Sequence, residues 1–144
     1  MFAYRTLLAP IAAATLLILA ACGGDSPTAS ASVVGTFALE TVNGKELPYV
    51  LADSAFQGNA VRVEVVSPSM MKFKSDMSFQ FILTIKVSAS GVPLMVEADT
   101  ATGTYSLTGR QLSMTASGST IRADWDGANS LVLNATPNVL VFGR

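Results

Sequence analysis

The chain has 144 residues, with nine basic and ten acidic side chains, a formal net charge of −1 and no histidine. This near-neutral balance argues against binding nucleic acid or another polyanion through charge. The missing histidine removes the commonest general base and the commonest transition-metal ligand, so we expect no enzyme, no metal site and no cofactor. Cys22 is the only cysteine, which rules out a disulfide within the chain.

The N-terminus has the pattern of a secretory signal peptide over residues 1–21. Arg5 supplies a positive charge, residues 7–19 are apolar, and two alanines precede Cys22. A spanning helix needs roughly 20 apolar residues, and this run is shorter and interrupted by Pro10. The pattern therefore favours a cleaved signal over a retained transmembrane helix.

The end of this segment, Leu19-Ala20-Ala21-Cys22, resembles the lipobox of bacterial lipoproteins. The resemblance implies a diacylglyceryl group on the Cys22 thiol, cleavage just before it, and labelling by palmitate. Two or more acyl chains hold a protein stably on a bilayer. We therefore expect an extracytoplasmic, lipid-anchored protein of the cell envelope. The alternative is an ordinary secreted protein with a cysteine near its cleavage site by chance.

Residues 22–32 read as the lipidated cysteine followed by a flexible tether of Ser, Gly and Ala, because this composition buries too little apolar surface to order itself. Gly23 follows the cysteine. In enterobacterial lipoproteins an Asp at that position marks retention in the inner membrane, so Gly23 favours the outer membrane if the cell has one. Residues 33–144 are then the folded domain.

The first half of this domain alternates apolar and polar residues with the period of β-strands. Residues 33–42 form the first expected strand, and Asn43-Gly44 is a strong signal for a tight turn. Residues 49–57 fit either a short strand or one helical turn over a barrel mouth. Ser67-Pro68 is expected to break the next strand. The strands expected around that break are 60–65, 70–74 and 77–88.

The second half continues in the same way, with no long helical period. Residues 92–97 and 101–107 are either two strands or one bent strand. Turns rich in Gly, Asn and Pro separate the remaining expected strands, 111–117, 120–126, 130–135 and 139–143. Short strands joined by turns at regular spacing predict an all-β antiparallel meander, either a barrel or a β-sandwich.

Gly35 to Pro48, GTFALETVNGKELP, resembles the opening of small bacterial lipocalin-like lipoproteins, with Gly-x-aromatic on the first strand and a "vNG..lP" turn. Gly103 to Met114 and Val139 to Arg144 resemble their later hairpins. The first-strand aromatic, usually Trp in lipocalins, is here Phe37. The resemblance implies an up-and-down barrel of about eight strands with an apolar interior.

Phe37, Phe79, Phe81 and Trp125 are the candidate ligand-binding residues. They belong to an inward-facing set that also includes Leu39, Met71, Phe73, Leu83, Met114 and Phe142. A small barrel is either filled solid by such side chains or holds one small ligand. The sequence leaves both readings open, with the filled core as the simpler one.

Acidic residues supply the remaining candidate chemistry. Residues 124–129 (DWDGAN) offer oxygen ligands at alternating spacing but lack the later glutamate of a calcium loop, and an Asp-Gly hairpin turn explains them. Four carboxylates are candidates for the acid and base of a glycosidase, although solvated surface charge explains them more simply: Asp53, Glu64, Glu97 and Asp99. We therefore expect no catalytic residues.

Two functions fit this sequence. The first is a membrane-anchored lipoprotein whose lipocalin-like barrel binds a small apolar or amphipathic ligand. The alternative is a non-enzymatic structural or protein-interaction domain of the cell envelope, with a solid core and a protein partner. A hydrolase is a distant third, because no serine elbow and no histidine are present.

Overall fold

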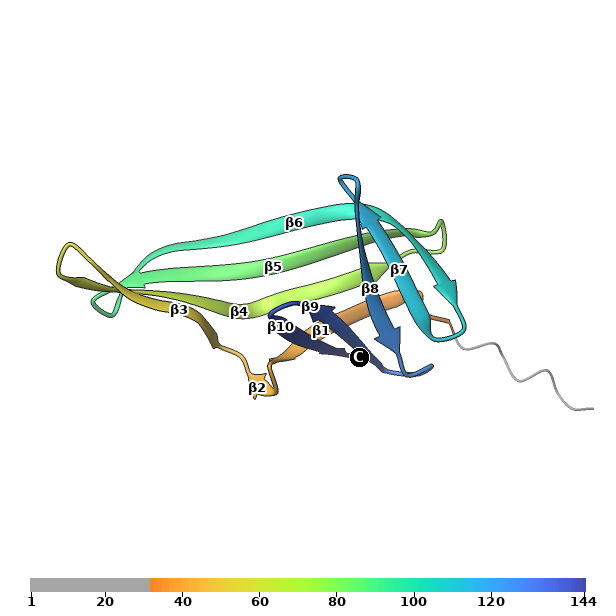
Figure 1. Ribbon diagram of the computed structural model, residues 1–144, viewed down its shortest axis with the longest axis horizontal. Helices are drawn as coiled ribbons and strands as arrows, with labels where there is room; N and C mark the ends of the chain where they lie inside the picture. The colour runs from red at the N-terminus through yellow and green to blue at the C-terminus, as the bar shows by residue number, and fades with distance from the viewer. Residues whose placement is uncertain (1–31) are drawn as a thin grey trace, which may run out of the picture. The chain divides into compact units, whose positions relative to one another are not determined.

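The computed structural model describes residues 32–144, so Cys22 and the expected signal peptide lie outside the described part of the chain. Within it all regular structure is β-strand. The ten strands are β1 (Gly35–Val42), β2 (Lys45–Glu46), β3 (Tyr49–Phe56), β4 (Asn59–Phe73), β5 (Ser78–Ala89), β6 (Val92–Thr108), β7 (Gln111–Ala116), β8 (Ser119–Trp125), β9 (Ser130–Ala135) and β10 (Asn138–Gly143) (Figure 1).

The strands form one antiparallel sheet in the order β2-β1-β10-β9-β8-β7-β6-β5-β4-β3, and β1 also pairs with β4. That extra pairing closes the sheet on itself. The result is a closed eight-stranded barrel made of β1 and β4 to β10, with β2 and β3 as additional strands. This architecture confirms the expected antiparallel meander and is consistent with a lipocalin-like barrel, not with the alternative β-sandwich.

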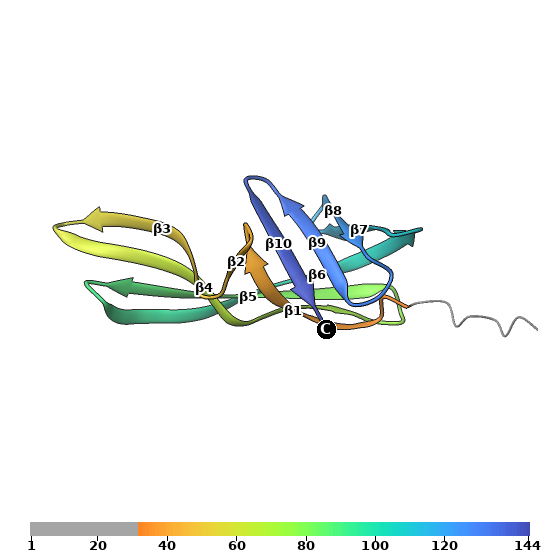
Figure 2. The same cartoon turned by 90° about the horizontal axis from the view of Figure 1, so that it is seen from below.

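Three barrel strands are longer than the barrel needs, and their extra length forms a four-stranded projection. We call this projection the wing: β3 with residues 59–65 of β4, 84–89 of β5 and 92–99 of β6. β3 pairs with β4 only as far as Val65, whereas β1 pairs with β4 from Met70 onward. In Figures 1 and 2 the wing extends to the left, away from β7–β10.

A bulge in β4 separates the barrel from the wing. The register between β4 and β5 shifts between Val66 and Met70, so the backbone ladder is interrupted there. Side chains replace the lost ladder bonds: the Thr84 amide donates to Ser69 Oγ at 2.9 Å, and that hydroxyl donates to the Val66 carbonyl at 2.8 Å. The Thr84 hydroxyl also donates to the Pro68 carbonyl. Buried polar groups therefore remain satisfied where β4 changes its partner.

The barrel is filled at its centre by aromatic and aliphatic side chains. Phe37, Phe73 and Phe142 are essentially inaccessible to solvent. The Phe73 ring centroid lies 6.0 Å from that of Phe37 and 4.9 Å from that of Tyr105, both in edge-to-face geometry. Such packing excludes a ligand from the middle of the barrel. All members of the inward set predicted from sequence are buried or packed against this core.

The structure settles two alternatives that the sequence left open, at residues 49–57 and 92–107, and corrects the expected strand break at Ser67-Pro68. A bulge at Glu40, between the pairs of Leu39 and Thr41, turns Val42 inward and leaves Thr41 half-buried. Residues 49–56 are strand. The expected strand break at Ser67-Pro68 is wrong: the register of β4 shifts there, but the strand continues. Residues 92–108 form one strand of 17 residues.

Candidate functional site

At one end of the barrel, the side chain of Arg144 links three separate segments of the chain. Its guanidinium donates hydrogen bonds to the carbonyls of Ser32, Val34 and Ala128 at 3.0, 3.1 and 2.7 Å. The same group lies over the Phe37 ring, with 4.6 Å between the guanidinium carbon and the ring centroid. The planar guanidinium thus joins both ends of the described chain to the turn between β8 and β9.

The other end of the barrel, from which the wing projects, carries an apolar pocket of about 290 Å³. Leu51 and Ile121 border it and are 40% and 39% exposed. Asn138 is the one residue among those lining it with a polar side chain. The deeper lining comes from five strands of the barrel and consists of Val42, Val65, Phe81, Leu83, Leu133 and Leu140.

The wing extends this apolar lining beyond the barrel. Strand β5 belongs to both the barrel and the wing, and its side chains alternate between the two faces without interruption. Phe81 and Leu83 line the pocket, and Ile85 and Val87 continue along the same face. On β4 the alternating residues Val61, Val63 and Val65 lie opposite Ala89, Val87 and Ile85. One face of the wing is therefore an apolar surface continuous with the pocket.

Two carboxylates stand on this same face of the wing. Glu97 of β6 is directly opposite Ile85, and Asp99 is directly opposite Leu83. With Ile85 and Met95 they line a second hollow of about 250 Å³. The sequence predicts Glu97 and Asp99 to be solvated surface charges, and both are exposed. Their side chains nevertheless share the inward phase of Tyr105 along β6, and they are exposed because the strand has left the barrel there.

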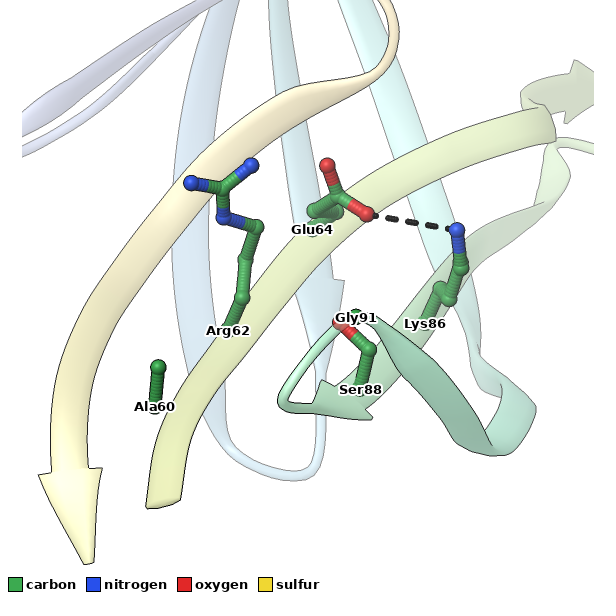
Figure 3. Close-up of a pocket in the computed structure, with 6 residues that line it drawn as sticks. All are labelled: Ala60, Arg62, Glu64, Lys86, Ser88 and Gly91. Atoms are coloured by element: carbon green, nitrogen blue, oxygen red, sulfur yellow. Dashed lines mark ion pairs between the residues drawn. The ribbon is translucent and has the colours of Figure 1, made fainter. Parts of the chain in front are cut away.

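The opposite face of the wing carries the ion pairs of the wing, and its charges compensate one another (Figure 3). It holds a hollow of about 360 Å³ lined by Arg62, Glu64, Lys86 and Ser88 with Ala60 and Gly91. Lys86 Nζ lies 3.5 Å from Glu64 Oε2. Arg62 donates to Asp53 at 2.9 Å, and this hydrogen bond, together with the carboxylate charge, raises the pKa of Arg62. Each cation already has an anion, so this hollow offers no net charge to a ligand.

The residues predicted to bind a ligand fall into two groups. Phe37, Phe79 and Trp125 are 0%, 3% and 4% exposed and pack in the filled core. Phe81 lines the open pocket and contacts Phe142 edge-to-face, with 6.0 Å between ring centroids. The structure therefore brings only Phe81 to the pocket. Strand alternation identified inward residues, but it could not tell which of them lie near the open end.

Residues 124–129 form a hairpin turn held by a carboxylate. Asp126 Oδ1 accepts hydrogen bonds from the backbone amides of Ala128 and Ser130 at 2.8 and 3.0 Å. These bonds, from Ser130 first and then Ala128, lower the pKa of Asp126. The Trp125 indole donates to the Ala128 carbonyl at 3.3 Å. Across residues 32–144 no three His, Cys, Asp or Glu side chains are grouped so as to hold a metal ion.

A comparison with protein-family models found no match to this chain, and a comparison with the curated proteins found no relative. In the part of the chain that the structure describes, no helix is long and apolar enough to cross a membrane.

Proposed function

We propose that this protein is an extracytoplasmic lipoprotein, held on a bacterial membrane through Cys22, whose barrel binds a small apolar or amphipathic molecule. Binding involves no covalent chemistry, and the protein is not an enzyme. The observation that carries the binding proposal is the apolar pocket at the end of the barrel from which the wing projects. Desolvating apolar surface drives binding at such a site.

The filled core limits how the molecule lies. Phe73 and Phe142 occupy the centre of the barrel, so the ligand enters only the outer part of the barrel and continues onto the apolar face of the wing. A pocket of about 290 Å³ is near the lower end of ligand sites, which span about 300–1,000 Å³. The size suits a small molecule or the end of a longer chain that then follows Ile85 and Val87.

A titration with the neutral dye N-phenyl-1-naphthylamine tests this proposal. We expect saturable binding with enhanced dye fluorescence, weakened at least fivefold by Ile121→Gln, since a polar amide replaces apolar surface at the pocket. Val139→Gln is the matched control, because Val139 is equally exposed at 38% but does not line the pocket. A dye that does not saturate, or equal weakening by both variants, would contradict the proposal.

The anchor is supported by the sequence alone, through the lipobox resemblance at Cys22. Its test is palmitate labelling in a bacterial host, followed by membrane fractionation. The wild-type chain should be labelled and sediment with membranes, in the outer-membrane fraction of a Gram-negative host. Cys22→Ser should be unlabelled. Equal labelling of the two would refute the anchor without bearing on the pocket.

A second candidate function is docking of an envelope protein partner onto the wing. Among residues 32–144, seven of the eleven large apolar side chains that are exposed lie on β3 and β6. β3 pairs only with β4, and β6 pairs with β7 only from Thr104 onward, so both strands have an unpaired edge. Exposed apolar edges are sites where another strand adds to a sheet.

A further inference from the structure

We propose that the molecule bound at the open pocket is an amphiphile with a positively charged head, and that Glu97 and Asp99 hold this head while the pocket takes the apolar tail. The inference rests on the proposed binding function and names the chemical class of its ligand. It follows from the continuity of two hollows and from the charges found on each face of the wing.

The pocket and the carboxylate-lined hollow are neighbours along one surface. Val65 lines the pocket, its cross-strand partner Ile85 lines the second hollow, and Glu97 is the partner of Ile85 on the other side. Leu83 and Asp99 repeat this relation one step nearer the barrel. Directly opposite residues on one face of an antiparallel sheet lie about 5 Å apart. A molecule seated in the pocket therefore leaves it alongside both carboxylates.

The charge along this path has one sign. Of all residues that line the two hollows, only Glu97 and Asp99 are charged. The cations of the wing, Arg62 and Lys86, stand on the other face, where Asp53 and Glu64 are their partners. Because successive side chains on a strand point to opposite faces, these cations cannot neutralise Glu97 and Asp99 without leaving the polar face.

An anionic head, such as that of a fatty acid or an alkyl sulfate, would be placed beside two like charges. A cationic head would be attracted by both. Two unit charges about 4 Å apart interact by about 1 kcal/mol in water, which corresponds to about a fivefold change in affinity for each carboxylate. At low ionic strength we therefore expect the cationic amphiphile to bind at least tenfold more tightly than the anionic one with the same tail.

The experiment compares three amphiphiles with one twelve-carbon tail, each below its micelle concentration, by isothermal titration calorimetry. They are dodecyltrimethylammonium, dodecyl maltoside and dodecyl sulfate. The variant is Glu97→Gln with Asp99→Asn. Its control is Glu40→Gln with Asp124→Asn, which removes the same charge from exposed positions outside both hollows.

We expect the order cation, neutral, anion for the wild type and the control, and near-equal affinities for the Glu97/Asp99 variant. Binding of the neutral maltoside without any preference by charge would overturn the inference and leave the proposed function standing. A preference that survives in the Glu97/Asp99 variant would also overturn it. If none of the three amphiphiles binds, both the proposed function and this inference are contradicted. If Glu97 and Asp99 serve only to keep other strands from pairing with the free edge of β6, their replacement would leave the order of the three affinities unchanged.

Discussion

The guanidinium carbon of Arg144 lies 4.6 Å from the centroid of the Phe37 ring, so the last residue of the chain covers an aromatic ring of the first barrel strand. The same group donates to three carbonyls, one from the β8–β9 turn and two from the segment that leads into β1. Gly35 makes this approach practicable: it has a φ of 144°, and a Cβ there would lie 3.0 Å from Arg144 Nη1.

Arg144→Ala should lower the free energy of unfolding by about 1–3 kcal/mol, because both the cation–π contact and the charged hydrogen bonds are lost. Arg144→Lys should restore only part of this, since one ammonium cannot match the planar fork of donors. Urea unfolding followed by Trp125 fluorescence measures the change. The exposed Arg122 is the control, and Arg122→Ala should stay within about 0.5 kcal/mol of wild type.

Ser69→Ala tests the bulge between barrel and wing. The substitution removes the acceptor of the buried Thr84 amide and should cost about 1–3 kcal/mol of unfolding free energy. Ser67→Ala, at an exposed position two residues earlier, should be nearly neutral. Amide hydrogen exchange adds a local readout: Thr84 should exchange faster in Ser69→Ala, and unchanged protection there would show that Ser69 does not hold this junction.

Gly103→Ala should destabilise the barrel strongly, although glycine on an exposed strand usually tolerates alanine. A Cβ at Gly103 would lie 2.0 Å from the Thr115 carbonyl oxygen and 2.9 Å from the Phe79 ring, so backbone must move. We expect a loss of more than about 2 kcal/mol, at the upper end of overpacking costs. Ala101→Gly, two residues away on the same face, is the comparison, and a smaller loss for Gly103→Ala than for that change would contradict the packing.

Acid should weaken the fold through two turn carboxylates. Hydrogen bonds from the Ser78 hydroxyl and amide lower the pKa of Asp76, and backbone amides lower that of Asp126. Because the pKa of each carboxyl is lower in the folded than in the unfolded chain, the unfolded chain binds protons first as the pH falls. The stabilisation from these carboxylates is therefore complete above the unfolded pKa of about 3.9 and is lost as the pH falls through the folded pKa. Urea midpoints at pH 6 and pH 3 measure this. Asp126→Asn should show a smaller drop than wild type.

The free edge of β6 predicts concentration-dependent association. Leu94 is 66% exposed, and no Lys or Arg stands on β6 to guard its edge. Leu94→Lys should therefore reduce association, measured by light scattering across a hundredfold range of protein concentration. Val139→Lys, on the internal barrel strand β10, should not. A wild-type chain that stays monomeric over the whole concentration range would contradict the prediction that this edge drives association.

The sequence predicted the strands well because alternation and turn chemistry are local signals. Asn43-Gly44 gave the correct turn, and the strand expected at residues 60–65 lies within β4. The pairing of β1 with β4 in place of β3 depends on contacts across more than 30 residues, which no local pattern contains. The wing was missed for this reason. Alternation says which face a residue occupies but not whether anything covers that face.

The candidate site was predictable only in part for the same reason. Phe81 and Trp125 have the same inward phase, yet one borders the open pocket and the other is sealed in the core. How far a side chain lies from the open end depends on where its strand begins along the barrel axis, and a local sequence pattern does not contain that information. Glu97 and Asp99 could have been found, because even spacing from Tyr105 along an uninterrupted strand gives them the inward phase.

The wing is built from two hairpins, and three of its four strands are continuations of the barrel strands β4, β5 and β6. Its reach is therefore adjustable, but only in matched steps: both hairpins must shorten together, and each strand must lose an even number of residues. An odd deletion at the base of a strand would turn every residue beyond it to the other face, so that a shortened protein would present its ion pairs on the surface that continues the pocket.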